Sequence, residues 1–380
     1  MSAYSPPGEE HVAFMQWAID QAVKVNGVEP ARIPGRGLGM IATKDIQEDE
    51  IMVEVPLSAM LSIDSIPATF VNLFNGKISL QGLLAAFFTH GDPNILKKFD
   101  LWKATWPNME DLEEGLPILW SKELGGLDLK HNSPNETAIA DDLSTSITLP
   151  PSASGLWNTF RRKSLVEDYQ TKHQNLLIRQ EKRLRDAWHD VLAVFPDTNW
   201  ETFAYYWLII NTRSFYYLMP GQERPEDTNE AMALVPFADY FNHIDNAECD
   251  VNFDGQTYTF RATKVYSQSQ SLLLFYLYEL IPVPPVEKGE EVYMSYGPHP
   301  NDFLFIECIL AILPSPSASN ADKIIKKDGF FLEENESDAL YLDDIIFKDF
   351  TAAEKEELIF ERYYGYVLRI YSHASVSKKL

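Results

Sequence analysis

The stretch GEEVYMSYG, residues 289–297, decides the fold of this 380-residue chain. It opens on a turn glycine, continues as a short strand and ends at a second glycine. Two tyrosines on a strand are usually packing residues, so Tyr293 and Tyr296 alone indicate no chemistry. Upstream, TYTFRATKVY (257–266) alternates as a half-buried strand does, and we expect the two stretches to form neighbouring strands of one core.

Composition bounds the class of protein. Apolar residues make up 45% of the chain and aromatic residues 13%, so a sizeable core can be buried. The net charge of −24 would repel nucleic-acid phosphates and attract basic partners. Two cysteines are too few for a disulfide framework or a structural zinc site, which fits a reducing, intracellular setting. We find neither a transmembrane run of about 18 apolar residues nor the pattern of a signal peptide.

Helical periodicity predicts two further features. Residues 9–26 read as an amphipathic helix, with Phe14, Trp17 and Ala18 on one face. The stretch LVEDYQTKHQNLLIRQEKRLRDAWHDVL (165–192) carries a group of basic residues, which we interpret as a solvated helix face rather than a binding stripe. This group consists of Arg179, Lys182, Arg183 and Arg185.

Two short stretches have residue types and spacings that are found at ligand-binding sites. GRGLGM (35–40) is a G-x-G-x-G run, but a strand rather than a helix follows it, so the dinucleotide fingerprint G-x-G-x-x-G does not apply. Glycines at this spacing let backbone amides approach a ligand, and the alternative is a plain hairpin turn. PFADYFNH (236–243) gathers Asp239, Asn242 and His243 in one segment. Metal ligation by His243 is disfavoured because no H-x-x-x-H pair or cysteine pair lies nearby, and a buried, hydrogen-bonded Asn-His pair is the alternative.

Together GRGLGM, NTRSF (211–215), PFADYFNH and GEEVYMSYG resemble the SET-domain protein lysine methyltransferases. The resemblance is closest to the branch of the Rubisco large-subunit methyltransferase and the fungal ribosomal-protein lysine methyltransferases. It implies an α+β fold, in which a mainly-β SET core is split by a long helical insertion and followed by the start of a C-terminal helical domain, which we expect to be truncated. The implied parts are an N-terminal helix with the first part of the core (1–60), the helical insertion (61–200), the second part of the core (201–307), and the end of the core with the start of the helical domain (329–380).

The resemblance also implies a cofactor, S-adenosyl-L-methionine, and a site. The residues implied to bind this cofactor are Arg36, Gly37, Leu38, Gly39, Arg213, Asn242, His243 and Phe330. Tyr296 matches the tyrosine at the methyl-transfer site, and the substrate side is matched by Tyr217, Asp239 and Cys308. A sulfonium already carries a good leaving group, so such an enzyme needs positioning more than a strong base. The target lysine must be neutral, and a dry channel beside a cation lowers its pKa from about 10.4.

Two inserts depart from the family pattern. The first, 267–287, contains the apolar run SLLLFYLYELIPV, and the second, 308–328, follows NDFLFIE. The second insert puts Cys308 in the place of a tyrosine that lines the lysine channel, and it displaces Phe330, which would pack on adenine. One hypothesis is that both inserts are translated introns, because removing GT…AG rejoins the flanking codons as a lysine and as that tyrosine. If the first insert is physically present, we expect an excursion that adds no strand or helix to the core.

The resemblance therefore implies a protein-lysine N-methyltransferase that acts on a ribosomal or other basic protein. We expect a monomer in the nucleus or cytoplasm, without direct nucleic-acid binding and without a membrane partner. Two alternatives remain at this point: a histone-lysine methyltransferase, and a SET-fold scaffold that no longer catalyses because its channel tyrosine and adenine-packing phenylalanine are displaced. Binding of S-adenosylmethionine without methyl transfer would indicate the scaffold.

Overall fold

The computed structural model describes residues 4–34, 36–121, 127, 129, 176–225, 227–244, 247–263, 286–308, 335, 337, 339–340, 350–360 and 368–369. The chain forms two compact units. The first comprises Met1–Trp106, Arg213–Gly297 and Ala311–Asp328, and the second comprises Pro107–Thr212, Pro298–Leu310 and Gly329–Leu380. The predicted domain boundaries at residues 60 and 200 stay a prediction, because the compact units divide the chain on a different criterion.

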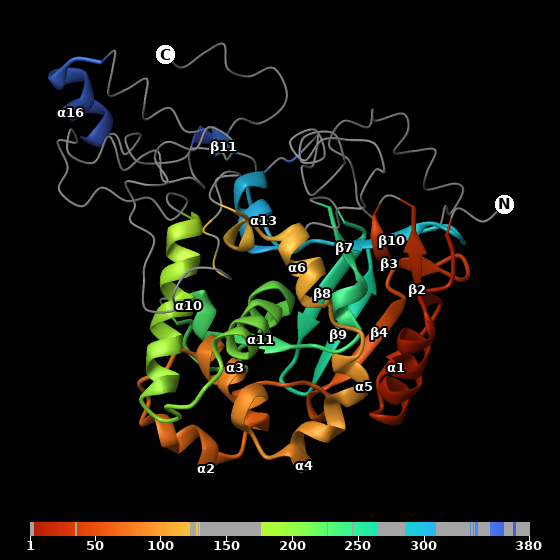
Figure 1. Ribbon diagram of the computed structural model, residues 1–380. Helices are drawn as coiled ribbons and strands as arrows, with labels where there is room; N and C mark the ends of the chain where they lie inside the picture. The colour runs from red at the N-terminus through yellow and green to blue at the C-terminus, as the bar shows by residue number, and fades with distance from the viewer. Residues whose placement is uncertain are drawn as a thin grey trace. The chain divides into compact units, whose positions relative to one another are not determined.

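One four-stranded sheet of the first unit carries most of the candidate site (Figure 1). Its strand order is β2 (Val28–Ile33), β3 (Gly37–Ala42), β10 (Glu291–Met294) and β7 (Asn242–His243). Strand β3 is antiparallel to β2 and β10, whereas β7 runs parallel to β10. The position of β10 therefore brings GRGLGM and PFADYFNH, about 200 residues apart in the sequence, to its two sides.

The second sheet of this unit has the order β1 (Lys24–Val25), β4 (Ile51–Pro56), β9 (Thr257–Ala262) and β8 (Cys249–Phe253). Strand β9 alternates buried and half-buried residues, as predicted. The prediction that β9 and β10 are neighbouring strands is wrong. Both edges of β9 are paired, with β4 on one side and β8 on the other, so its backbone groups are already satisfied. A small ribbon of β5 (Ser214–Tyr216) and β6 (Met232–Leu234) completes the strands of this unit.

Helix α1 (Glu9–Asp20) covers the first unit with the predicted face, because Phe14 and Ala18 are fully buried. The Phe14 ring stacks at 6.3 Å on Trp102 of α5 (Asp100–Lys103). The predicted helix is too long, since Ala22 has a left-handed φ of 65° and the chain continues as β1. The other α-helices in the described part of this unit are α2 (Ala68–Val71), α3 (Leu80–His90) and α4 (Pro93–Leu96).

The described part of the second unit is mainly helical. Its helices are α6 (Met109–Gly115), α10 (Leu176–Leu192), α11 (Trp200–Arg213), α13 (Asn301–Glu307) and α16 (Ala352–Phe360), with a two-stranded ribbon of β11 (Ala339–Leu340) and β12 (Leu368–Arg369). Trp188 of α10 packs edge-on against Trp200 of α11 at 5.1 Å. None of the described helices combines the length and apolar content needed to cross a bilayer.

The interpretation of the basic group on α10 as a solvated face is correct for Arg179 and Lys182, which are exposed, and wrong for Arg183 and Arg185. Arg185 has only 2% of its side chain exposed and donates through Nε to Glu181 Oε1 at 2.8 Å. Arg183 is mostly buried and pairs with Glu307. Lys182 does lie in solvent, beside Asp186. A buried guanidinium is tolerated where a carboxylate and further hydrogen bonds offset its loss of water, and both arginines have such a carboxylate.

Most of the two inserts lies outside the described residues, and so does Phe330. In the first insert the structure describes Val286 and Glu287. Val286 is buried, and its carbonyl accepts the N–H of Ile46 at 3.0 Å in an isolated β-bridge. Val286 and Glu287 form no strand or helix, and the expectation for the rest of this insert stays a prediction. The intron hypothesis stays a prediction.

Candidate functional site

Side chains from three strands of one sheet converge on the carboxylate of Glu291. Its side chain is 8% exposed. Oε1 accepts from Asn242 Nδ2 at 2.6 Å, and Oε2 accepts from Tyr293 Oη at 2.6 Å and from Arg36 Nη1 at 2.9 Å. Burial raises the pKa of Glu291, while the Asn242 hydrogen bond and the charge of Arg36 oppose that rise. Sequence reasoning missed Glu291, because nothing in the sequence separates it from its neighbour Glu290.

The GRGLGM turn lies against this cluster. Ile33 pairs with Gly37 across the β2–β3 hairpin, so the hairpin interpretation of the turn is correct. Gly37 has a φ of 78°, which favours glycine. A Cβ added at Gly39 would stand 2.8 Å from Glu291 Oε1 and 2.9 Å from Asn242 Nδ2. Gly39 is therefore required by the close approach of these two side chains.

His243 and Tyr296 hold each other in place. The backbone N–H of Tyr296 lies 3.1 Å from His243 Nδ1, and the carbonyl oxygen of Met294 lies 3.4 Å from the same nitrogen. The two rings stack at 4.9 Å with an interplanar angle of 18°. The Tyr296 hydroxyl donates to the carbonyl of Phe241 at 2.7 Å. The phenol is thus positioned by its backbone, its ring and its hydroxyl, all against the PFADYFNH segment.

Arg213, the last residue of α11, forms an ion pair with Asp239. Arg213 Nη1 and Asp239 Oδ2 lie 2.8 Å apart, and the Asp239 side chain is 7% exposed. Arg213 Nε and Asp239 Oδ1 are also buried, and neither has a hydrogen-bond partner among the described residues. A buried donor of a guanidinium fits a ligand carboxylate, and a buried carboxylate oxygen fits an ammonium. An α-amino acid group, such as the methionine portion of S-adenosylmethionine, carries both.

The hydroxyl groups of Tyr217 and Tyr240 form hydrogen bonds within the protein. Tyr217 is buried and donates to Asp64 Oδ2 at 2.8 Å, and burial raises the pKa of Tyr217 to about 12. Tyr240 lies between Asp239 and the Asn-His pair, and its hydroxyl is 2.7 Å from His11 Nδ1. Burial raises the pKa of Tyr240 and lowers that of His11, so both groups are neutral near pH 7. No sequence motif connects His11 with this segment.

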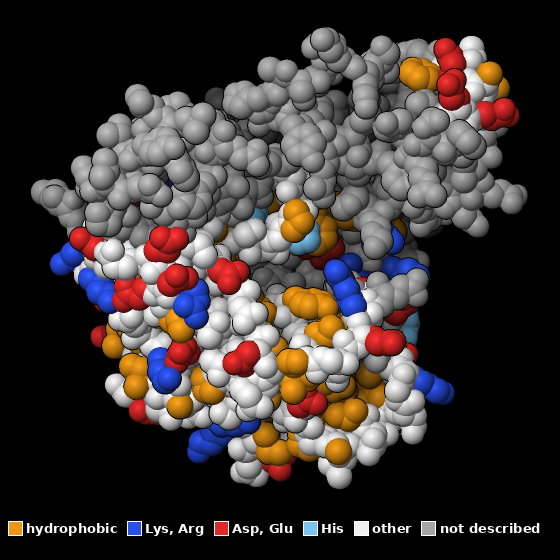
Figure 2. All heavy atoms as spheres, turned by 180° about the vertical axis from the view of Figure 1, so that it is seen from behind, with side chains coloured by type: hydrophobic (Ala, Val, Ile, Leu, Met, Phe, Trp, Pro, Cys, Tyr) orange, Lys and Arg blue, Asp and Glu red, His pale blue; other side chains and the backbone are white. Residues whose placement is uncertain are grey.

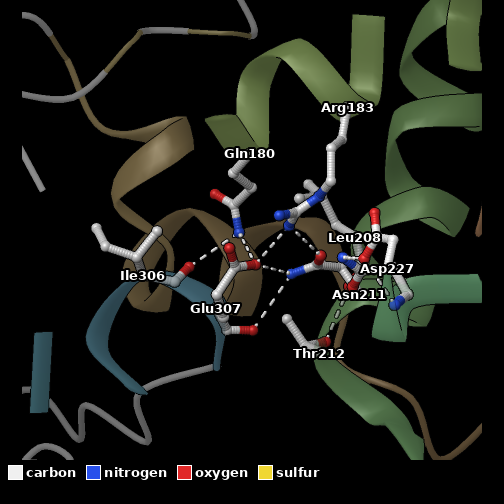
Figure 3. A network of polar contacts seen from close by, with 9 residues as sticks. Gln180, Arg183, Leu208, Asn211, Thr212, Asp227, Ile306 and Glu307 are labelled. Atoms are coloured by element: carbon white, nitrogen blue, oxygen red, sulfur yellow. Dashed lines mark hydrogen bonds and ion pairs between the residues drawn. The ribbon is translucent and has the colours of Figure 1, made fainter. Parts of the chain in front are cut away.

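In the second unit a polar network surrounds the carboxylate of Glu307 at the end of α13 (Figure 3). Glu307 Oε2 accepts from Arg183 Nη2 at 2.8 Å, Asn211 Nδ2 at 3.0 Å and Gln180 Nε2 at 3.1 Å. Gln180 Nε2 also donates to the carbonyl of Ile306 at 2.9 Å. The network joins α10 and α11 to the end of α13, immediately before Cys308.

Cys308 itself closes α13, with its N–H donating to the carbonyl of Leu304 at 3.0 Å. Its surroundings raise the pKa of the Cys308 thiol, so the side chain is not a thiolate at neutral pH. No group of three His, Cys, Asp or Glu side chains is gathered as a metal would require in the part of the chain that the structure describes.

Comparison with known proteins agrees with this geometry. No protein-family model matches the chain. It is 22% identical over 330 residues to "SET domain-containing protein 4" of Mus musculus, covering 83% of this chain and 62% of the relative. It is 27% identical over 141 residues to "Ribosomal lysine N-methyltransferase set11" of Schizosaccharomyces pombe, covering 37% of this chain and 31% of the relative. The crystal structure of the SET domain of LSMT bound to lysine and AdoHcy matches with a TM-score of 0.52 at 14% identity, over 97% of this chain and 68% of that one.

The fold and the gathered site define the class: the chain has the SET-domain fold, in the α+β class predicted. The predicted resemblance to the SET-domain lysine methyltransferases is confirmed by these relatives. The chain spans about 60% of the length of the SET domain-containing protein 4 relatives.

Proposed function

We propose that the chain is an S-adenosyl-L-methionine-dependent protein-lysine N-methyltransferase that acts on a ribosomal or other basic protein. The observation that carries this proposal is the buried pair of Arg213 Nε and Asp239 Oδ1, a donor and an acceptor without partners among the described residues. Asp239 belongs to the PFADYFNH segment, whose Phe241 carbonyl accepts from the Tyr296 hydroxyl. Support also comes from the relatives, several of which are named lysine methyltransferases.

The cofactor residues fit their proposed role. Arg213 offers a guanidinium edge for the carboxylate of the cofactor, while its Nη1 stays with Asp239. We assign Gly37, Leu38 and Gly39 of the β2–β3 turn to the cofactor through their backbone groups, and the side chains of Ile33, Glu291 and Asn242 pack around Gly39. The bound cofactor would supply a methyl group on a cationic sulfonium. Arg36 is the exception in this turn, because its guanidinium is committed to Glu291.

Tyr296 is the residue that we assign to the methyl-transfer site. Its hydroxyl proton is directed to the Phe241 carbonyl, so the phenol oxygen presents lone pairs that can accept from an incoming amine. A lysine amine surrounded by aromatic rings and carbonyls loses water, which lowers its pKa toward the neutral form. Orientation by hydroxyls and carbonyls then suffices, and no strong base is required.

A basic substrate fits the net charge of −24. On the face drawn in Figure 2, Lys and Arg side chains are interspersed with Asp and Glu, so the acidity is not gathered into one patch there. The fungal relatives are named ribosomal lysine methyltransferases, which favours a ribosomal substrate over a histone. We further propose a monomer in the nucleus or cytoplasm, without nucleic-acid or membrane partners.

The test is methyl transfer by the full chain. Purified protein is mixed with tritiated S-adenosylmethionine and either ribosomal-protein extract or core histones, and cofactor binding is measured by calorimetry. We expect labelled ribosomal protein, and Tyr296→Phe should lower transfer by roughly tenfold or more while cofactor affinity is retained. Tyr216→Phe is the matched control, because Tyr216 is 46% exposed.

Two other results would change the proposal. Binding without transfer to either substrate would indicate the scaffold alternative, which is favoured by the presence of Cys308 in place of a channel tyrosine. Transfer to histones alone would indicate the histone-directed alternative.

A further inference from the structure

We propose that Glu291 is a positioning residue for the cofactor site: its buried carboxylate orients the carboxamide of Asn242 so that Oδ1 faces the α-ammonium group of S-adenosylmethionine. The assignment rests on the proposed function and adds to it a residue that does not touch the cofactor. It begins from the contacts of Asn242, which lies on β7 beside β10.

The orientation of the Asn242 side chain is fixed by what surrounds it. Nδ2 lies 2.6 Å from Glu291 Oε1 and 3.1 Å from the carbonyl oxygen of Leu38. A carbonyl and an ionised carboxylate only accept hydrogen bonds, so both must be met by N–H groups. The two N–H groups of the carboxamide are thereby used, and Oδ1 points away from both acceptors. Among the described residues none donates to Oδ1, and an acceptor held in this way fits a cationic donor.

Leu38 alone would not secure this orientation. Without Glu291, one N–H of Asn242 would have no acceptor, and rotation of the carboxamide by half a turn would present Nδ2 instead of Oδ1. An N–H group facing an ammonium places donor against donor, which removes the hydrogen bond and leaves a repulsion. The carboxylate therefore acts on the cofactor through the rotation state of one amide.

The Glu291 carboxylate is itself held in place by hydrogen bonds. Tyr293 and Arg36 both donate to Oε2, which leaves Oε1 for Asn242. Arg36 is 53% exposed and balances the negative charge from the solvent side. Strand β10 places Glu291 opposite Ile41 of β3 and its second neighbour Tyr293 opposite Asn242 of β7. Glu291 thus reaches both the glycine-rich turn and the Asn-His segment from the strand between them.

The adjacent residue provides a matched control. Glu290 carries the same charge one position earlier, but it is exposed and its carboxylate accepts from the backbone N–H of Glu287 at 2.9 Å. Glu290 precedes β10 and is exposed, so it does not share the environment of Glu291. An effect of overall charge should appear in substitutions of both glutamates. An effect that acts through Asn242 should appear only in the substitution of Glu291.

The experiment measures cofactor affinity of the full chain by calorimetry. Glu291→Ala should bind S-adenosylmethionine roughly 10- to 100-fold more weakly than the wild type, while Glu290→Ala should stay within about twofold. Glu291→Gln keeps one acceptor oxygen, but its NH2 group would face either Asn242 Nδ2 or the donors Tyr293 and Arg36, so its affinity should lie between those of Glu291→Ala and the wild type. Circular dichroism and the thermal midpoint of each variant report whether it is folded.

A second ligand tests the proposed contact between Asn242 Oδ1 and the α-ammonium group of the cofactor. The analogue of S-adenosylhomocysteine that lacks the α-amino group should bind the wild type more weakly than S-adenosylhomocysteine does. For Glu291→Ala the two ligands should bind alike, because the group that Oδ1 would meet is no longer recognised. A merely structural role would weaken both ligands by the same factor.

The outcomes separate the two proposals. If the folded wild type binds no cofactor, the proposed function fails and this assignment with it. If the wild type binds, but Glu291→Ala matches Glu290→Ala or retains the full preference for the α-amino group, only the assignment of Glu291 is overturned.

Discussion

Removal of the Glu307 carboxylate should loosen the helices that it joins in the second unit. In Glu307→Ala, Arg183, Asn211 and Gln180 lose a shared acceptor that lies between 2.8 and 3.1 Å from their nitrogen atoms. Gln180 is fully buried, and Glu307 has only 9% of its side chain exposed. Each donor keeps a neutral acceptor, namely Asn211 Oδ1 for Arg183, the Glu307 carbonyl for Asn211 and the Ile306 carbonyl for Gln180. The cost is therefore mainly that of leaving a mostly buried guanidinium without its carboxylate.

The magnitude follows from the exposure of each partner. Removing one member of a buried ion pair costs about 3–5 kcal/mol. The Arg183 side chain is 29% exposed and can regain part of its hydration, and Gln180 keeps its hydrogen bond to the Ile306 carbonyl. We therefore expect the free energy of local opening to fall by about 2–4 kcal/mol.

Native-state hydrogen exchange is the suitable assay, because it reports opening of individual helices in a chain with two compact units. Backbone amides of α10 and α13 should exchange roughly 30- to 800-fold faster in Glu307→Ala. Lys182→Ala is the matched control on α10, since the Lys182 side chain is 72% exposed and its pair with Asp186 should contribute less than about 1 kcal/mol. If both variants exchange alike, the network contributes no more than an exposed ion pair and the reasoning is refuted.

Two further predictions concern the first unit. Gly39→Ala should weaken S-adenosylmethionine binding by roughly tenfold, because the added methyl group would stand within 3 Å of two polar side chains of the site; equal affinity by calorimetry would contradict the close approach. Burial holds the pKa of His11 below its ordinary value of 6.5, so the unfolded chain takes up a proton that the folded chain does not. The free energy of unfolding should therefore hold its full value above about pH 6.5 and fall as the pH drops below it. Urea unfolding of His11→Gln should show a shallower loss, with exposed His189→Gln as the control, and equal slopes in His11→Gln and the wild type would refute the assignment.

The motifs of the site could be found from the sequence, because each is local. Residue types and spacing within GRGLGM, PFADYFNH and GEEVYMSYG are set by a few neighbouring positions, and strand periodicity is read from the same short range. The order of these motifs was sufficient to indicate the SET domain. Alternation and the flanking turn residues were sufficient to predict the strands at 257–262 and 291–294.

The partners of these residues could not be predicted in the same way. Strand β9 is separated from β10 by its pairing with β4 and β8, and pairing depends on residues far apart in the chain. Arg183 and Arg185 read as solvated because charge alone is visible in a sequence, whereas the carboxylates that let them be buried come from the tertiary contacts and from one helical turn.

The glutamate pair in GEEVYMSYG separates the two kinds of information most clearly. The sequence by itself determined that a short strand follows Gly289, that it carries Tyr293 and Tyr296, and that this stretch belongs to a SET domain. Only the tertiary structure decided that Glu291 is buried against Asn242 while Glu290 is exposed. The reason is that alternation assigns the two carboxylates to opposite faces, but which face is covered depends on strands that the chain brings together from more than 40 residues away.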